Sequence, residues 1–398
     1  MRISSNTIFD SNVAALNQQQ SKLFHTQQQI TSGRRILTAA DDPVAAAAAL
    51  AVSQSDASNT QYAANRVATT NALSMSEGTL QGVTSILQDI RTAVIAAGQS
   101  MLTTSDRSTY AVEISSKLQE LLGVANSTDG TGNYLYSGFQ SRTQPFVNTP
   151  AGVSYFGDDG QRNMQVDTSI QMAASDSGAD IFMRIKNGNG TFVTQAAGIN
   201  VGAGVISRGS VTNPSLLTSN DYSINFSVVA GVTTYDVTNT TTGTPVLTAQ
   251  PYVSGQAISF DGMQVDVSGV PLSGDSFTVT PSINESVFKT ISDLVAALNA
   301  PVVGANLANS VSRGLNNLDN ALNNVLNTRS SLGLRLSQID SLQATGDNLS
   351  LQFKQTLSSL QDVDYNKAAS ELAQQNMLLQ AAQQSFVKVA GLSMFNYL

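Results

Sequence analysis

The residues whose types and spacing best suit catalysis or metal binding in this chain are paired carboxylates. Asp41 and Asp42 stand directly before Pro43, and Asp362 and Asp364 lie two positions apart. Such pairs can serve as a general acid and base or hold a divalent ion. An aspartate at a helix start also accepts the first free N–H groups, and proline suits the first helical position. We therefore interpret both pairs, with Pro43, as helix-start motifs.

Other residues that catalysis or metal binding commonly needs are scarce. The chain has no Cys and one histidine, His25, which we expect on a solvated helix face. Segment 202–207 has serine where a dinucleotide fingerprint needs its third glycine, and segments 157–160 and 187–190 lack calcium-loop spacing. We therefore expect no enzyme activity, no cofactor and no metal, with tight turns in the last two segments.

The overall composition excludes several classes of partner. The 398 residues include 20 Lys+Arg and 28 Asp+Glu, for a net charge of −8, so the clustered cations of a nucleic-acid groove are not expected. Residues 1–30 lack the apolar core of a signal peptide. The longest apolar run, 44–52, is far shorter than the roughly 20 residues of a membrane span. We expect no nucleic acid and no membrane insertion.

The distribution of proline divides the chain. Seven of its nine prolines lie between Pro145 and Pro281, where alternating or β-branched segments are bounded by Gly, Asp and Asn. Antiparallel strands are predicted over 222–229, 232–237, 257–260, 263–267 and 276–280. The flanks are rich in Ala, Gln, Leu and Ser, which favour or tolerate helix. The predicted fold is mainly α with an inserted antiparallel β domain.

Both flanks carry apolar residues at helical spacing. A long coiled-coil-like stripe runs from Val311 to Leu360, and residues 43–98 and 104–127 predict two more helices of the same bundle. A shorter stripe lies near each end of the chain. The two short stripes, which we interpret as the assembly interface, consist of Val13, Leu16, Leu23 and Ile30 with Leu372, Leu379, Phe386 and Val389.

The two terminal stripes are expected to cover each other. Each helix must bury its apolar side, and an antiparallel pair of the N- and C-terminal helices achieves this most simply. Polar residues at Gln20, Gln27 and Gln375 interrupt the predicted seam, so the pair is expected to be weak alone. Subunits whose contacts are spread along terminal helices are typical of assemblies.

The expected organisation has five segments. An N-terminal assembly helix (1–42) pairs with a C-terminal assembly helix (364–398). A helical rod domain is formed by two halves, 43–140 and 285–363. A β domain (141–284) is inserted between those halves.

The residues at the two ends resemble the flagellin superfamily, and within it the proteins of the hook–filament junction. The resemblance rests on MRISSNTIF (1–9), QITSGRR (29–35) before Asp41, Asp42 and Pro43, and GLSMFNYL (391–398). Segments 134–138, 145–147, 157–162 and 356–365 fit as well. The similarity covers about 1–165 and 284–398, whereas the middle matches only as a β insertion.

This resemblance implies a structural subunit of the bacterial flagellum. It would join the hook, through the first hook-associated protein, to the flagellin filament, and it would self-associate in a ring. It also implies export through the flagellar type III channel without a cleaved signal, an export chaperone before secretion, an extracellular location, and terminal segments that order on assembly. Two alternatives are a flagellin-type filament subunit and a secreted adhesin that acts through its β domain.

Overall fold

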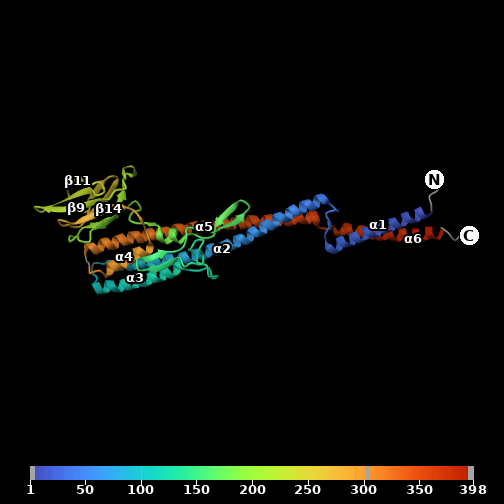
Figure 1. Ribbon diagram of the computed structural model, residues 1–398, viewed down its shortest axis with the longest axis horizontal. Helices are drawn as coiled ribbons and strands as arrows, with labels where there is room; N and C mark the ends of the chain where they lie inside the picture. The colour runs from blue at the N-terminus through green and yellow to red at the C-terminus, as the bar shows by residue number, and fades with distance from the viewer. Residues whose placement is uncertain (1–4, 100, 302–303, 393–398) are drawn as a thin grey trace. The chain divides into compact units, whose positions relative to one another are not determined.

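The computed structural model describes residues 5–99, 101–301 and 304–392. Helices occupy both flanks and strands the middle (Figure 1), which confirms the predicted class of helical termini around an antiparallel β domain. The chain forms two compact units. We call residues 1–64 with 341–398 the terminal unit and residues 65–340 the central unit. Within the described ranges, no helix has the length and apolar character needed to span a membrane.

The described part of the terminal unit consists of helices and the segments that connect them. It contains α1 (Ser5–Ser32), α6 (Tyr365–Leu392), the beginning of α2 (Pro43–Ala97) and the end of α5 (Ala305–Gln361). Within this unit, Asn59 on α2 donates a 2.7 Å hydrogen bond to the carbonyl of Gly346 on α5. Alanines Ala45 and Ala49 of α2 are buried. Because alanine side chains are small, a neighbouring helix can approach the start of α2 closely.

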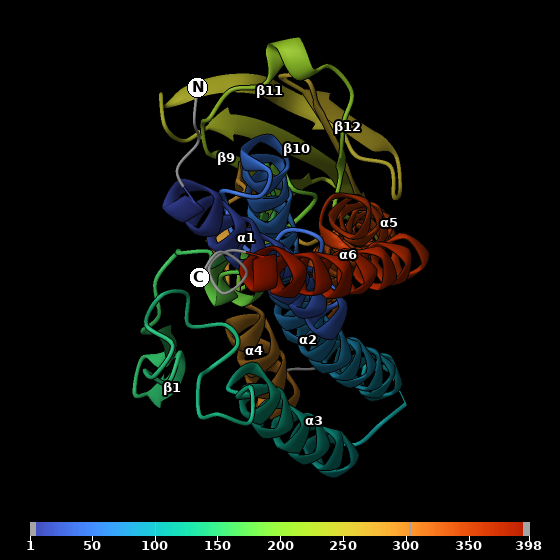
Figure 2. The ribbon, with the colours of Figure 1, turned by 90° about the vertical axis from the view of Figure 1, so that its right-hand side faces the viewer.

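The central unit adds two shorter helices, α3 (Thr104–Ala125) and α4 (Val287–Asn299), which pack together (Figure 1, Figure 2). The predicted break after residue 98 is confirmed, and Thr103 with Asp106 forms a capping box at the start of α3. The half predicted as 285–363 divides into α4 and α5. Ser286 caps α4, and the helix ends before Ala300, which is extended because Pro301 follows it.

Fully buried side chains follow the predicted stripe of α5 in this unit. Leu318, Val325 and Leu332 are each 1% exposed, and Leu73 and Leu80 of α2 are completely buried. Ion pairs also link α2 to α5, between Arg329 and Glu77 at 2.6 Å and between Arg91 and Asp319 at 2.7 Å. Four helices therefore enclose their apolar stripes here.

The predicted strands are confirmed to within two residues. The main antiparallel sheet has the order β11-β10-β9-β14-β6, so β6 is an edge strand. Its strands are β6 (Phe192–Ala196), β9 (Tyr222–Val229), β10 (Val232–Asn239), β11 (Thr244–Pro251) and β14 (Ser276–Pro281). A second sheet contains β7 (Val205–Ile206), β8 (Ser210–Val211), β12 (Ala257–Phe260) and β13 (Met263–Ser268). The two sheets share an apolar core that includes Ile224, Phe226, Val265 and Phe277.

Three two-stranded ladders connect this β core to the helices. They are β1 (Phe146–Thr149) with β2 (Gly152–Tyr155), β3 (Asn163–Asp167) with β4 (Ile170–Ala173), and β5 (Ile185–Lys186) with β15 (Asn284–Glu285). Short helical turns occupy Ala179–Met183 and Pro214–Leu216. Phe146, Phe182 and Phe288 form a buried ring cluster with centroids 5.3–5.9 Å apart.

One polar face of α5 binds the backbone of the β region. Successive asparagines on this face, spaced so that they project from the same side of the helix, bond to main-chain groups of residues 180–206. The second of these, Asn309, donates to the carbonyl of Gly204 at 3.0 Å and accepts from the N–H of Ile206 at 2.9 Å. We call this set, Asn306, Asn309, Asn317, Asn320 and Asn324, the asparagine stripe.

Two glycines of α5 predict opposite effects of the same substitution. A Cβ at Gly314 would overlap the buried side chain of Leu294 on α4, whereas a Cβ at Gly333 meets no atom within 4 Å. Gly314→Ala should therefore lower the free energy of unfolding of the central unit by about 1–3 kcal/mol. Gly333→Ala should raise it by up to about 1 kcal/mol through helix propensity.

Denaturant unfolding of the two variants, followed by circular dichroism, measures both effects. Equal shifts of the two variants in the same direction would contradict close α4–α5 packing at Gly314.

Candidate assembly interface

The first and last helices lie side by side and run antiparallel. At one end the rings of Phe9 and Phe386 have centroids 5.2 Å apart. At the other end Arg34 and Asp362 form an isolated antiparallel bridge, flanked by the N–H of Val363 donating to the carbonyl of Gly33 at 3.0 Å. Both contacts define the same register. It places Leu16 level with Leu379 and Leu23 level with Leu372.

The predicted interface residues are only half-buried in this pair. This holds for every predicted position whose side chain is described: Val13, Leu16, Leu23, Ile30, Leu372, Leu379 and Phe386. Val389 lies within α6, and its side chain is outside the described part of the chain. The almost fully buried residues of the pair are small, Thr26 at 3% and Ala368 at 4% exposure. Two helices alone thus leave part of each of these apolar residues in contact with water.

The polar seam differs from the prediction in α1. Gln20 and Gln27 are exposed, and Gln19 and Thr26 are the less exposed residues instead. The heptad counted from Val13 assigns Gln20 and Gln27 to the seam, whereas in the structure Gln19 and Thr26 lie there. Gln19 and Gln20 have the same hydropathy, so the sequence pattern alone does not decide between them. On α6 the amide oxygen of Gln375 is buried and has no hydrogen-bond partner within the described part of the chain. A buried acceptor without a partner costs about 1–3 kcal/mol, which weakens the pair.

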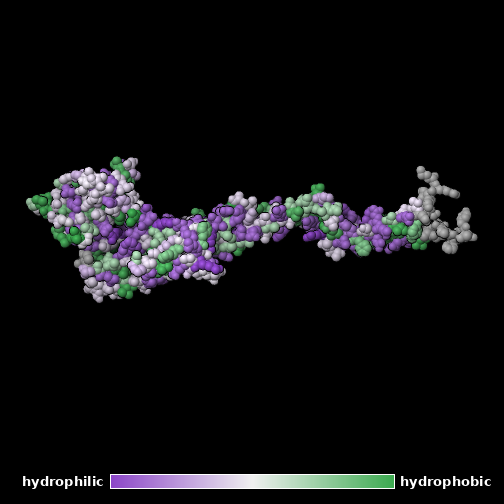
Figure 3. Space-filling view, in the orientation of Figure 1, coloured by the Kyte–Doolittle hydropathy of each residue, from purple (hydrophilic) through white to green (hydrophobic). Residues whose placement is uncertain are grey.

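Large apolar side chains lie on the outer surface of the same helices. Phe24 is 57% exposed, and Met377, Leu378 and Val387 are also exposed, as is half of Phe9. On the face that Figure 3 shows, green apolar patches lie between purple polar ones along the terminal helices. The sequence contained the signal, since Phe24 and Leu378 each adjoin a predicted seam leucine, but it was missed. Single exposed apolar residues are common, whereas several on one short helix pair indicate a contact surface.

The loop after α1 connects the start of α2 to the end of α5. Asp42 accepts a hydrogen bond from the N–H of Ala45 at 3.0 Å, and Pro43 is the first residue of α2. Arg35 bonds to Asp42 at 3.1 Å and to the carbonyl of Leu360 on α5 at 2.8 Å. These contacts fix where α2 begins relative to the end of α5.

Asp41 and Asp364 organise neighbouring turns. Asp41 accepts from the N–H groups of Leu37 and Thr38 at 2.9 and 2.8 Å and lies 3.0 Å from His25 Nε2. Asp364 accepts from the N–H of Lys367 at 3.2 Å at the start of α6. Within the described part of the chain, no group of three or more His, Cys, Asp or Glu could hold a metal ion.

The same hydrogen bonds favour the charged carboxylates. The N–H of Thr38, aided by Leu37 and His25, lowers the pKa of Asp41 below 3.8. The N–H of Ala45, with Arg35 beside it, lowers the pKa of Asp42 in the same way. The chemistry here is therefore that of helix ends, with carboxylates held ionised as acceptors.

Comparisons with known proteins match both flanks and the middle of the chain to domains of flagellar proteins. Residues 3–141 match the bacterial flagellin N-terminal helical region, and residues 315–398 match the bacterial flagellin C-terminal helical region. Residues 196–281 match the flagellar hook-associated protein 1, D2-like domain.

Full-length relatives give a narrower assignment. Flagellar hook-associated protein 3 of Salmonella typhimurium is 27% identical and covers 99% of each chain. The crystal structure of flagellar hook associated protein-3 from Legionella pneumophila is 34% identical, with 78% of this chain and 98% of that chain covered and a TM-score of 0.73. The crystal structure of FlgL from Xanthomonas campestris is 29% identical, with 77% of this chain and 99% of that chain covered and a TM-score of 0.71.

Lowered pKa values at Asp41 and Asp42 predict local opening in acid. A group whose folded pKa is depressed stabilises the fold above its unfolded pKa, and that contribution is lost as pH falls through the folded value. The amide resonances of Leu37, Thr38 and Ala45 should therefore shift with midpoints below 3.8 in an NMR pH titration.

Asp41→Asn supplies the matched control, because its amide oxygen still accepts hydrogen bonds but does not titrate. Thr38 should then lose its step while Ala45 keeps its own. A Thr38 midpoint at or above 3.8 in the unaltered chain would contradict the assignment.

Proposed function

The chain belongs to the flagellar hook-associated protein 3 (FlgL) family, and we propose that it is the structural adaptor subunit that joins the flagellar hook to the flagellin filament. The single observation that carries this function is similarity along 99% of the chain to a hook-associated protein 3. These relatives are structural flagellar proteins, so we infer that the chain acts through contacts rather than catalysis.

The β domain favours a junction protein over a filament subunit. Flagellin similarity covers the two helical flanks, where hook-associated proteins and flagellins share a plan. The middle instead resembles a domain of flagellar hook-associated protein 1. A filament subunit, the first alternative, therefore accounts for less of the chain.

We propose two layers of contact on the terminal helices. Val13, Leu16, Leu23 and Ile30 face Leu372, Leu379, Phe386 and Val389 within one subunit. The exposed set around Phe24 and Leu378 meets neighbouring subunits. A two-helix seam with half-buried leucines and an unpartnered Gln375 gives little free energy to offset ordering entropy. Neighbours in an assembly would supply the missing burial.

The proposed partners follow from this surface. Copies of the chain associate in a ring between the first hook-associated protein on one side and flagellin on the other. An export chaperone covers the C-terminal amphipathic helix before secretion, since an apolar helix face suits a helix-in-groove contact. We further propose export through the flagellar type III channel and an extracellular location.

Three adjacent residues of α6 separate the two layers experimentally. Leu379→Asp should unpair α1 from α6 and abolish incorporation, because it places a charge in the seam. Leu378→Asp should also abolish incorporation but leave the pair formed, since Leu378 is 50% exposed. Gln380→Asp, at an exposed polar position, should do neither and is the matched control.

Incorporation is measured by immunogold labelling of flagella in cells that carry each variant as their sole copy. Amide exchange of the purified variants reports whether the pair forms. Normal incorporation of Leu378→Asp would refute an outer contact surface there, and loss of the folded central unit in any variant would refute the division between the units.

Deletion of the gene in its host tests the function itself. Bare hooks with unpolymerised flagellin in the medium are expected, because filament subunits would have no junction on which to assemble. Hooks without flagellin in the medium would instead identify the chain as the filament subunit, and normal filaments would contradict both roles. Purified chain should form short rings at most, whereas a filament subunit would polymerise without limit.

A further inference from the structure

The asparagine stripe of α5 has a gap. Between Asn309, which holds β7, and Asn317, which accepts from the N–H of Gly188 at 2.9 Å, the helix face presents Arg313. No hydrogen bond or ion pair of the Arg313 side chain is found among the described residues. The asparagine stripe therefore forms hydrogen bonds to the backbone of the β region on both sides of Arg313 but not at Arg313 itself.

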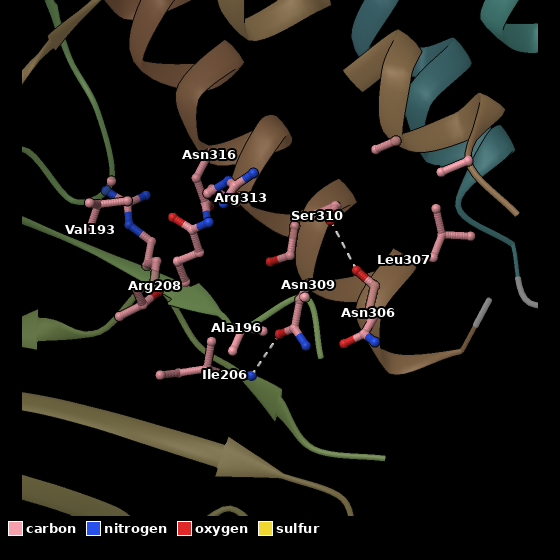
Figure 4. Close-up of a pocket in the computed structure, with 18 residues that line it drawn as sticks. Val193, Ala196, Ile206, Arg208, Asn306, Leu307, Asn309, Ser310, Arg313 and Asn316 are labelled. Carbon is pink, nitrogen blue, oxygen red and sulfur yellow. Dashed lines mark hydrogen bonds between the residues drawn. The ribbon is translucent and has the colours of Figure 1, made fainter. Parts of the chain in front are cut away.

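A cavity occupies this gap. It has a volume of about 140 Å³ and is bounded by the edge strand β6, the start of α5 and the segment between β7 and β8. That segment contributes Arg208, an exposed residue whose guanidinium forms no hydrogen bond or ion pair among the described residues. Figure 4 shows Arg208 on the strand side of the cavity and Arg313 with Asn316 on the helix side.

The charge of the cavity is uncompensated. None of the described residues that line it is acidic, whereas Arg208 and Arg313 both line it. Four arginines of the central unit form ion pairs with carboxylates, Arg184, Arg329 and Arg335 at 2.6 Å and Arg91 at 2.7 Å. Arg208 and Arg313 thus bring two guanidinia without a carboxylate partner to one cavity, in a chain of net charge −8.

An adjoining cavity of about 220 Å³ differs in this respect. It shares Arg313 with the first but also contains carboxylates that are already occupied. Lys289 pairs with Asp293 at 2.6 Å, and Glu285 accepts from Thr290 at 2.8 Å and from Asn317 at 3.1 Å. An anion is therefore favoured on the side of Arg208, away from these acids.

We propose that the cavity between Arg208 and Arg313 binds a carboxylate. The planar guanidinium fork matches a carboxylate in two parallel hydrogen bonds, and two arginines on opposite walls can hold its two oxygens. The amides of Gln195 and Asn316, also in the lining, accept or donate to neighbouring polar groups of the ligand. The volume suits a small organic acid or the end of one Asp or Glu side chain from another protein.

NMR titration of the full chain with succinate tests the proposal, with the neutral succinamide as the control ligand. Succinate should shift the amide resonances of β6 and the first turns of α5 in a saturable manner, and succinamide should not. Arg208→Gln and Arg313→Gln should each weaken succinate about tenfold or more, through loss of a charge-assisted contact. Arg313→Lys should recover part of the affinity.

Arg142→Gln is the matched control, because Arg142 is exposed and lies outside the cavity lining. It should bind succinate as the unaltered chain does. Equal shifts with succinamide, unchanged affinity in Arg208→Gln and Arg313→Gln, or an equal loss in Arg142→Gln would each overturn the proposal.

The two sources of carboxylate are distinguished by blocked peptides. Tighter binding of acetyl-Ala-Glu-Ala-amide than of succinate, with no binding of its Gln counterpart, assigns a protein side chain. Tighter binding of succinate assigns a free acid.

Discussion

The burial that a helix can achieve depends on how many neighbours it has, and this constraint governs the whole chain. In the central unit α2 and α5 pack with α3 and α4, and their stripe residues Leu80 and Leu318 are almost completely buried. In the terminal unit α1 and α6 have the same kind of stripe, yet Leu16 and Leu379 are only half-buried. The chemical character of the stripes is similar, so the difference lies in the missing neighbours. A chain built this way has a core that is complete in the monomer and a helix pair that neighbours in the proposed assembly would cover.

Polar contacts to the main chain provide the second means of holding the fold together. Asparagine side chains of α5 bond to carbonyl and N–H groups of the β region, so the interface depends little on which side chains the β strands carry. Buried amides must be satisfied, and Asn309 meets this demand with one bond in each direction. Such contacts fix the position of a strand along a helix more sharply than apolar packing does, because a shift of one residue leaves several groups unpartnered.

Much of this architecture could be read from the sequence, and the failures share one cause. Strands 222–229 and 257–260 follow from alternation and turn residues, and the start of α2 follows from Asp42 and Pro43, because these signals are local. The second row of the α1 seam was misplaced, since Gln19 and Gln20 have the same hydropathy and only the partner helix selects between them. The asparagine stripe was likewise missed, because an asparagine on a helix reads as a solvated residue until the strand it contacts is known. Where a residue's role depends on the helix or strand that it contacts, the local sequence pattern does not reveal that role.

An unpaired charge or an exposed apolar surface is informative where comparable groups of the same molecule are paired or covered. Within the central unit, the arginines at 184, 329 and 335 have carboxylate partners, and most of the apolar stripe of α5 is covered. Two places depart from this pattern in different ways. The terminal pair exposes Phe24 and Leu378, which calls for apolar neighbours, and the gap at Arg313 leaves positive charge without a counter-charge, which calls for an anion. Because an exposed apolar surface calls for an apolar neighbour and an unpaired positive charge calls for an anion, we expect the chain to make two separate kinds of contact.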